Sequence, residues 1–126
     1  MQSKGNAPTK AQSDWREEVR ALGCIVSMEK GPHIQIHHVL GATAKHNKVE
    51  IGHWFILPLT GWYHLDNPTL NVTNNKKMLE AQFGSQVNLW LQLLKNYEFH
   101  YERPAPVPPE VVESIRDLGR CSPVNT

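Results

Sequence analysis

Histidines are concentrated in one segment of this chain, because six of the seven lie between His33 and His64. Within that segment, Ile34 and Ile36 alternate with other residues and lead into the adjacent pair His37-His38. Alternation with a period of two is typical of a strand that buries one face. The sequence therefore predicts a strand that carries two imidazoles at its end.

A second apolar run, at residues 54–59, follows a polar loop that contains lysines. Thr60 then offers a helix N-cap just before His64. Asp66-Asn67-Pro68 should end this helix, because proline cannot continue it and restricts the residue before it. The predicted order is strand, loop, strand and short helix.

The chemistry of imidazole suggests what these histidines do. A neutral imidazole binds divalent metals, and one that titrates near neutral pH also takes a proton from water. With His37 as a metal ligand, His38 as the base and His64 closing the metal site, the segment can hydrolyse a phosphodiester. Strict alternation would point His37 and His38 to opposite faces, so a joint site requires a twist or a bulge at the end of the strand.

The order and spacing of these residues resemble the ββα-metal fold of HNH endonucleases, and more narrowly the phage recombination-enhancement nucleases (the Ref family). In that family Gly-Cys-Ile-x-Cys is followed by Ile-His-His, His-x-x-x-Ile-Pro-Leu-Cys, a closing His-His and a basic helix ending in Glu-x-x-aromatic-Gly. The matching segments here are residues 23–27, 36–38, 53–60, 63–64 and 76–84. The resemblance implies an α+β fold, with a ββα-metal (HNH-like) module between N- and C-terminal helices.

The resemblance also implies a function: a metal-dependent DNA endonuclease of phage or prophage type that acts in recombination or DNA processing. It makes His38 and His53 the catalytic candidates and His37 and His64 the metal ligands. For His53 two interpretations stay open. In the functional one it orients the site or contacts phosphate, and in the structural one it simply begins the second strand. The alternative function is a non-catalytic DNA- or protein-binding module on a degenerate HNH scaffold.

The expected cofactor is one divalent metal ion, with Mg²⁺ as the working ion and Mn²⁺, Zn²⁺ or Ni²⁺ as alternatives that a two-histidine site accepts. No structural zinc is expected. Where relatives have cysteines, this chain has Ser27, Thr60 and Tyr63, which leaves Cys24 alone, and one thiolate cannot build a tetrahedral zinc site. Packing of three aromatic residues is expected to replace the zinc: Trp54, Trp62 and Tyr63.

DNA is the expected partner, although the formal net charge of +1 provides no global basic field. Binding must therefore come from local groups of lysines. Lys45 and Lys48 in the loop, with Lys76 and Lys77 on a later helix, form the predicted phosphate-binding patch, and a solvated charged face is the competing interpretation. A host recombinase filament or another phage protein is a further candidate partner.

Length suits one domain with a modest core, and we divide the chain into a flexible N-terminus (1–8), an HNH-like nuclease domain (9–102) and a proline-rich connector with a C-terminal helix (103–126). Two distant cysteines and no apolar signal segment favour a reducing compartment. The longest apolar run is too short for a membrane span, so we expect no membrane association and a location in the cytoplasm of a bacterial host.

Flanking elements follow from capping and periodicity. Helices are predicted from Thr9 to Gly23, from Thr73 to Phe83, after Ser85 and over residues 110–118, and a short strand at residues 24–26 is expected to pair with the His33 strand. Three histidines outside the proposed site are interpreted as structural: His33, His46 and His100.

Overall fold

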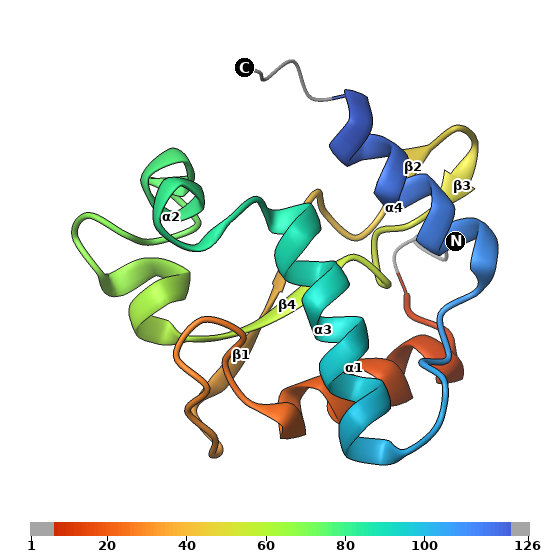
Figure 1. Ribbon diagram of the computed structural model, residues 1–126, viewed down its shortest axis with the longest axis horizontal. Helices are drawn as coiled ribbons and strands as arrows, with labels where there is room; N and C mark the ends of the chain where they lie inside the picture. Colours follow the sequence, from red (N-terminus) through yellow and green to blue (C-terminus); the bar gives the residue numbers. More distant parts are fainter. Residues whose placement is uncertain (1–6, 122–126) are drawn as a thin grey trace.

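The computed structural model describes residues 7–121, so most of the predicted flexible N-terminus lies outside the described residues. The chain forms a mixture of helices and small antiparallel sheets, which confirms the predicted α+β class. Figure 1 shows α3 running across the front of the strands, with α1 near its C-terminal end. The elements in chain order are α1 (Lys10–Leu22), β1 (Ile34–His38), β2 (Lys45–His46), β3 (Val49–Glu50), β4 (Ile56–Thr60), the π-helical turn η2 (Trp62–Asp66), α2 (Lys76–Phe83), α3 (Gln86–Tyr101) and α4 (Pro109–Cys121).

The central sheet pairs the two strands predicted on either side of the lysine loop. β1 runs antiparallel to β4, with Ile34 opposite Thr60 and His38 opposite Ile56. All five residues of β4 are buried, whereas β1 buries Ile34 and leaves its histidines partly exposed. The strand order β1, β4 followed by η2 is the predicted order of strand, strand and short helix.

Capping explains where the main helices begin. The Thr9 hydroxyl accepts from the backbone of Gln12, and the Gln12 side chain accepts from the backbone of Thr9, which is the predicted capping box of α1. Ser85 caps α3 through the backbone N–H of Asn88. α2 instead starts after Asn75, so the prediction that Thr73 caps it was wrong, and the Thr73 hydroxyl donates to the carbonyl of His64.

Two predictions around the central sheet were wrong. Residues 24–26 form no strand, since a turn covers residues 25–27, and the backbone N–H of Ile25 donates to the carbonyl of Pro58 in β4, not to β1. Thr60 is the last residue of β4 and is buried, while Gly61 takes the N-cap position of η2 without a side-chain hydrogen bond. The turn around Cys24 is closed locally, because Met28 donates its N–H to the Cys24 carbonyl.

The lysine loop contains a small hairpin that sequence periodicity did not predict. β2 pairs with β3, and Asn47 and Lys48 between them both have positive φ, as a tight two-residue hairpin turn requires. Nε2 of His46 lies 2.8 Å from the Asp117 carboxylate of α4, so this histidine fastens the hairpin to the last helix. That contact fits the structural interpretation of His46.

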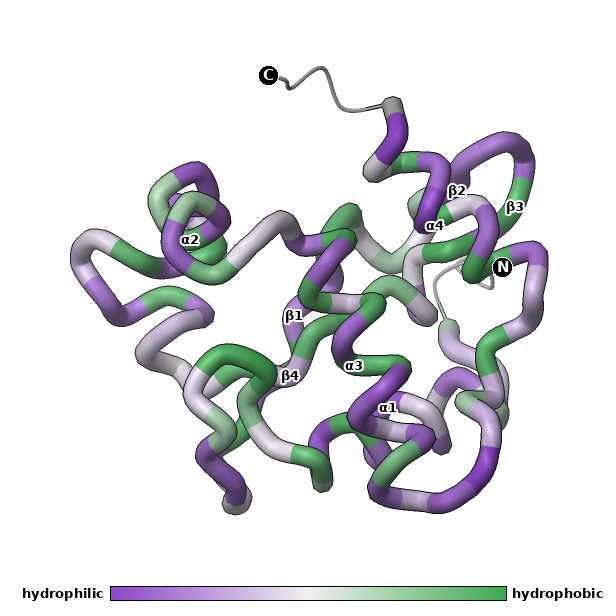
Figure 2. The backbone as a smooth tube through the Cα atoms, in the orientation of Figure 1, coloured by the Kyte–Doolittle hydropathy of each residue, from purple (hydrophilic) through white to green (hydrophobic). Residues whose placement is uncertain are grey.

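One hydrophobic cluster includes residues from α1, both central strands, α3 and α4. Figure 2 shows β4, with its hydrophobic residues in green, in the middle of the molecule. Val111 and Ile115 bring α4 into the same cluster, so the C-terminal helix docks on the rest of the chain. Trp54 is buried as expected, but Trp62 is 52% exposed, so the prediction that it packs in place of a zinc was wrong. No helix within residues 7–121 has the length and apolar character that crossing a bilayer requires.

Candidate active site

The strand β1 places its two adjacent histidines on opposite faces. Its pairing with β4 matches residues one to one from Ile34 to His38, and therefore contains no bulge. Between Ile34 and His38 the structure thus lacks a bulge, one of the two ways in which the end of the strand could turn both imidazoles to one side. Each histidine instead meets a second imidazole: His37 lies against His64, and His38 lies against His53.

The first imidazole pair joins the end of β1 to η2. The ring centroids of His37 and His64 are 5.3 Å apart, with the rings edge to face. Nε2 of His37 lies 3.1 Å from Oε1 of Gln86, at the start of α3. Nδ1 of His64 lies 2.6 Å from Oε1 of Gln35, on β1. Both imidazoles are thus oriented by an amide oxygen, and each keeps its other ring nitrogen for a ligand.

This arrangement fits a divalent metal ion held by two imidazoles. Among residues 7–121 no group of three or more histidine, cysteine, aspartate or glutamate residues is placed to hold a metal. A site with two protein ligands leaves positions for water and for phosphate oxygens, which are the ligands that Mg²⁺ prefers, while the imidazoles themselves also suit Zn²⁺ or Ni²⁺. His37 and His64 are therefore the residues that would hold the ion.

Burial keeps these imidazoles neutral, which both metal binding and base catalysis require. The pKa of His37 is lowered to about 4, chiefly by desolvation and also by the charges of His64, His38 and Lys76, while its hydrogen bond to Gln86 raises it. Desolvation also lowers the pKa of His64, while the Asp66 carboxylate raises it.

The second imidazole pair lies on the other face of β1. Nε2 of His38 and Nδ1 of His53 are 3.2 Å apart, so one ring donates a hydrogen bond to the other. Desolvation lowers the pKa of His38, and the charges of His53 and Arg16 act in the same direction. His38 is therefore neutral at pH 7 and can accept a proton. Of the two interpretations of His53, the structure favours one in which it orients a site residue.

The loop that carries His53 is held tightly from both sides. A Cβ on Gly52 would lie 2.2 Å from the carbonyl oxygen of Ala42, so only glycine permits this close approach of two backbones. The carbonyl oxygen of Trp54 accepts two indole N–H groups, at 3.1 Å from Trp15 of α1 and 2.8 Å from Trp90 of α3. We call this arrangement, made by Trp15, Trp54 and Trp90, the indole clamp, and it fixes the backbone next to His53.

Sequence reasoning missed Arg16. The indole clamp places Trp15 against Trp54, and the next residue of α1 is close enough to the second imidazole pair for its charge to lower the pKa of His38. Arg16 also contacts the Glu17 carboxylate at 3.3 Å. The only signal in the sequence was its place beside Trp15 on a predicted helix, and nothing there connected that helix to His38.

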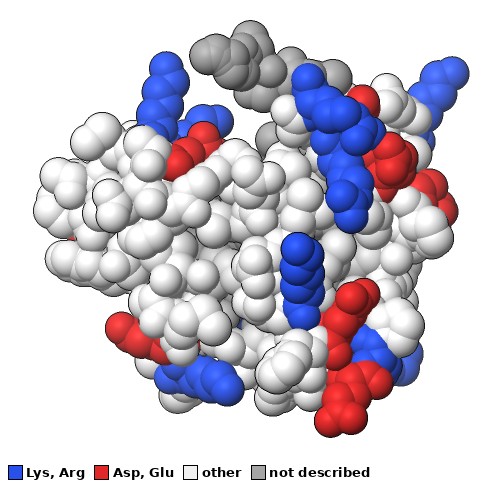
Figure 3. Space-filling view, viewed as in Figure 1, with Lys and Arg blue, Asp and Glu red and all other residues white. Residues whose placement is uncertain are grey.

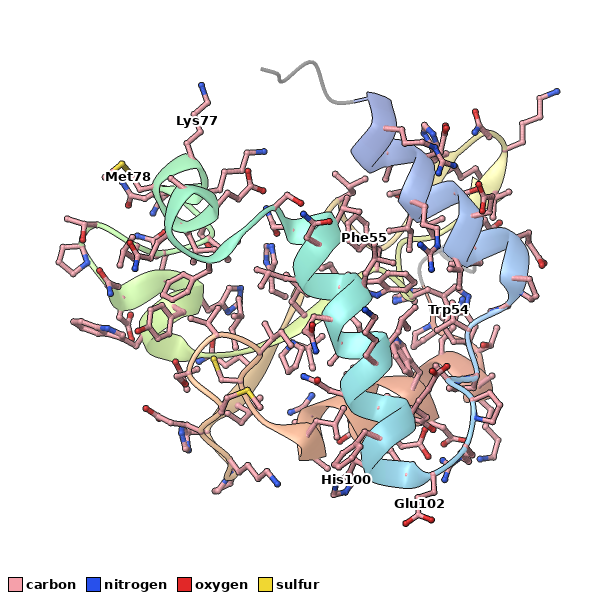
Figure 4. All side chains as sticks on the ribbon, in the orientation of Figure 1. Trp54, Phe55, Lys77, Met78, His100 and Glu102 are labelled. Carbon is pink, nitrogen blue, oxygen red and sulfur yellow. The ribbon has the colours of Figure 1, made fainter. Side chains whose placement is uncertain are left out.

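The four predicted phosphate-binding lysines do not form one patch. Lys45 and Lys48 belong to the β2–β3 hairpin, whereas Lys76 and Lys77 begin α2, and Figure 1 shows these elements on opposite sides of the molecule. Figure 3 shows positive and negative side chains interspersed on the visible face, with no continuous basic surface. Lys77 points away from the protein (Figure 4). Of the four lysines, Lys76 acts on the site, since its charge lowers the pKa of His37.

Comparison with protein families gave a match to a family described as recombination enhancement, RecA-dependent nuclease, over residues 8–103. The matched range contains both imidazole pairs, Arg16 and all four lysines, and it ends before α4. Comparisons with curated proteins and with solved structures gave no match.

Proposed function

Since this chain belongs to the family of recombination-enhancement, RecA-dependent nucleases, we propose that it is a metal-dependent DNA endonuclease of the HNH type, as found in phages and prophages. The observation that supports this most directly is the pairing of His37 with His64 beside a second pair, His38 with His53. One pair supplies two neutral metal ligands, and the other supplies a neutral base. Metal-assisted hydrolysis of a phosphodiester uses groups of both kinds.

The residues of β1 divide the chemistry between them. His37 with His64 and His38 with His53 lie on opposite faces of β1, so in this proposal the end of β1 twists when DNA and metal bind, which brings His38 to the phosphodiester held beside His37 and His64. His38 takes the proton of a water molecule whose oxygen attacks phosphorus, the bond from phosphorus to the leaving sugar oxygen breaks, and that oxygen takes a proton from solvent water. The hydrogen bond between His38 and His53 holds the base in place.

His37 and His64 hold the metal ion in this proposal, and Mg²⁺ is the ion we propose for the cell. A bound divalent ion supplies positive charge that stabilises the phosphate and the leaving oxygen as negative charge builds on them. The protein contributes the orientation of both imidazoles, which Gln86 and Gln35 fix through their amide oxygens. No structural zinc is part of the proposal, because Cys24 has no second thiol near it in the described part of the chain.

DNA is held by cations close to each imidazole pair. Arg16 lies near His38, and Lys76 lies near His37, so both faces of β1 have a positive side chain for a phosphate. Lys77 extends this surface along α2, while Lys45 and Lys48 would contact a more distant part of the DNA. The family description adds dependence on RecA, and we propose a RecA filament as the partner that presents the DNA.

A nicking assay on supercoiled plasmid and on single-stranded DNA tests the proposal, with and without a RecA filament and with Mg²⁺ or Mn²⁺ added. We expect cleavage that requires the metal and that chelator abolishes. Binding of DNA without metal-stimulated cleavage on any DNA form, with or without the filament, would contradict the nuclease proposal and favour a non-catalytic binding module.

A further inference from the structure

A buried amide connects the candidate metal ligand His37 to a carboxylate on a different helix. Gln86 is the first residue of α3 and only 6% exposed, and its Oε1 lies 3.1 Å from Nε2 of His37. Its Nε2 lies 3.3 Å from the Glu80 carboxylate of α2. The same carboxylate oxygen also accepts the backbone N–H of Gln86 at 3.3 Å.

These contacts determine which way the amide faces. A carboxylate oxygen accepts hydrogen bonds, so the amino group of Gln86 must turn toward Glu80. The carbonyl oxygen of the same amide then faces His37 and can only accept. Nε2 of His37 must therefore carry the proton, and its Nδ1 must carry the lone pair.

We infer that Glu80 and Gln86 are positioning residues that hold His37 as the Nε2–H tautomer and so present Nδ1 as the ligand atom. The role rests on the proposed function, since a metal ion is what the lone pair would bind. Partners of this kind fix both the tautomer and the ring orientation of metal-binding histidines. Neither residue touches DNA or metal in this account.

Glu80 also has a purely structural use that a test must separate. Its carboxylate lies at the N-terminus of α3, where a negative charge is favourable and a free backbone N–H needs an acceptor. A loss of stability after substitution would follow from that use alone. The tautomer of His37 and the metal affinity are the readouts that a structural role would not move.

The test is nitrogen NMR of the protein with ¹⁵N-labelled histidine, since the ring nitrogen shifts distinguish the two tautomers without any metal. For wild type we expect His37 with its proton on Nε2. In Glu80→Lys the new ammonium donates to the Gln86 carbonyl oxygen, the amide turns, and His37 should change to the Nδ1–H tautomer. Glu110→Lys is the matched control, because it reverses a charge in the first turn of α4 instead.

A second variant keeps the inference testable if Glu80→Lys does not fold. Gln86→Met keeps the length of the side chain and removes both hydrogen bonds, so the His37 Nε2–H should exchange faster with solvent. Mn²⁺ affinity should fall by about 10- to 100-fold in Gln86→Met and Glu80→Lys, the usual effect of losing such a partner.

Wild-type His37 with its proton on Nδ1 would overturn the inference, and so would wild-type tautomer and Mn²⁺ affinity in Glu80→Lys. Failure of the proposed function gives a different result. In that case the tautomer changes as expected between the variants, but no form of the protein binds Mn²⁺ or cleaves DNA.

Discussion

Three partly buried histidines, His37, His38 and His64, have pKa values below the ordinary value of 6.5, with desolvation as the largest cause for each. Below pH 6.5 these three histidines therefore bind protons in the unfolded chain but remain largely neutral in the folded protein. The stability that these groups contribute to the fold is present above pH 6.5. It is lost as the pH falls toward their pKa values in the folded protein, which for His37 is about 4.

Acidification across this window should thus destabilise the wild type more steeply than a His37→Asn variant. The midpoint of urea unfolding, measured at intervals between pH 6.5 and about pH 4, checks this expectation. Two parallel curves would show that His37 is not desolvated as the structure indicates.

Arg16 offers a sharper test of where DNA lies. Arg16→Gln should weaken DNA binding and reduce the salt dependence by roughly 0.7 to 0.9 log units, the effect of one lost phosphate contact. Glu17→Gln should strengthen binding, because it removes the carboxylate that engages Arg16 at 3.3 Å. Salt titrations of DNA affinity provide both values.

Arg20→Gln is the matched control for Arg16→Gln. Arg20 lies on the same helix and contacts the same Glu17 at 3.6 Å, whereas the arginine whose charge lowers the pKa of His38 is Arg16. Equal losses in the two variants would mean that the DNA responds to the charge of α1 as a whole and not to a contact made by Arg16.

At the scale of residues, the sequence identified the four imidazoles of the candidate site but not the side chains that orient them. Adjacent histidines after an alternating run are a local signal, which is why His37 and His38 stood out. Gln35, Gln86 and Arg16 come from three different elements, and only the packing of α1, β1 and α3 brings them to the imidazoles. That packing has no local signature.

Among the elements, the loop that carries His53 depends on the indole clamp. Trp15→Phe or Trp90→Phe removes one buried N–H donor and some core volume, so each should cost about 1–3 kcal/mol of unfolding free energy. Cleavage should fall as well, because His53 would lose its fixed position beside His38. Urea denaturation and nicking rates are the measurements.

Trp62→Phe is the control for the clamp, since Trp62 is 52% exposed and donates to nothing in the clamp. Its effect on stability should stay within about 0.5 kcal/mol. A Trp15→Phe protein as stable and as active as Trp62→Phe would show that the clamp does not hold the loop.

Elements with strong local signals were predicted well, and those set by tertiary contacts were not. The capping box of α1 and the Ser85 cap of α3 are encoded within a few residues. Residues 24–26 have the composition of a strand, but their backbone closes a loop at Cys24 and bonds to Pro58 through Ile25. The β2–β3 hairpin has two residues in each strand, which is too few for an alternating pattern to appear in the sequence.

The whole molecule is built around a hydrophobic core that includes Cys24, which is fully buried and accepts a hydrogen bond from the backbone of Ser27. We therefore expect the protein to purify without stoichiometric zinc and to keep its melting temperature in chelator, because packing already supports the fold. Elemental analysis that finds one zinc per chain, retained in chelator and needed for folding, would contradict this expectation.

The central claim is that the two faces of β1 do different work, with His37 and His64 holding a metal ion and His38 acting as the base. The most direct measurement compares Mn²⁺ affinity and DNA cleavage in His37→Ala and His38→Ala. His38→Ala should keep wild-type affinity for Mn²⁺ and DNA while cleavage falls by about 10²- to 10⁴-fold. His37→Ala should bind Mn²⁺ more weakly, and excess metal should restore part of its activity. Equal residual cleavage in both variants, unaffected by added metal, would contradict the account.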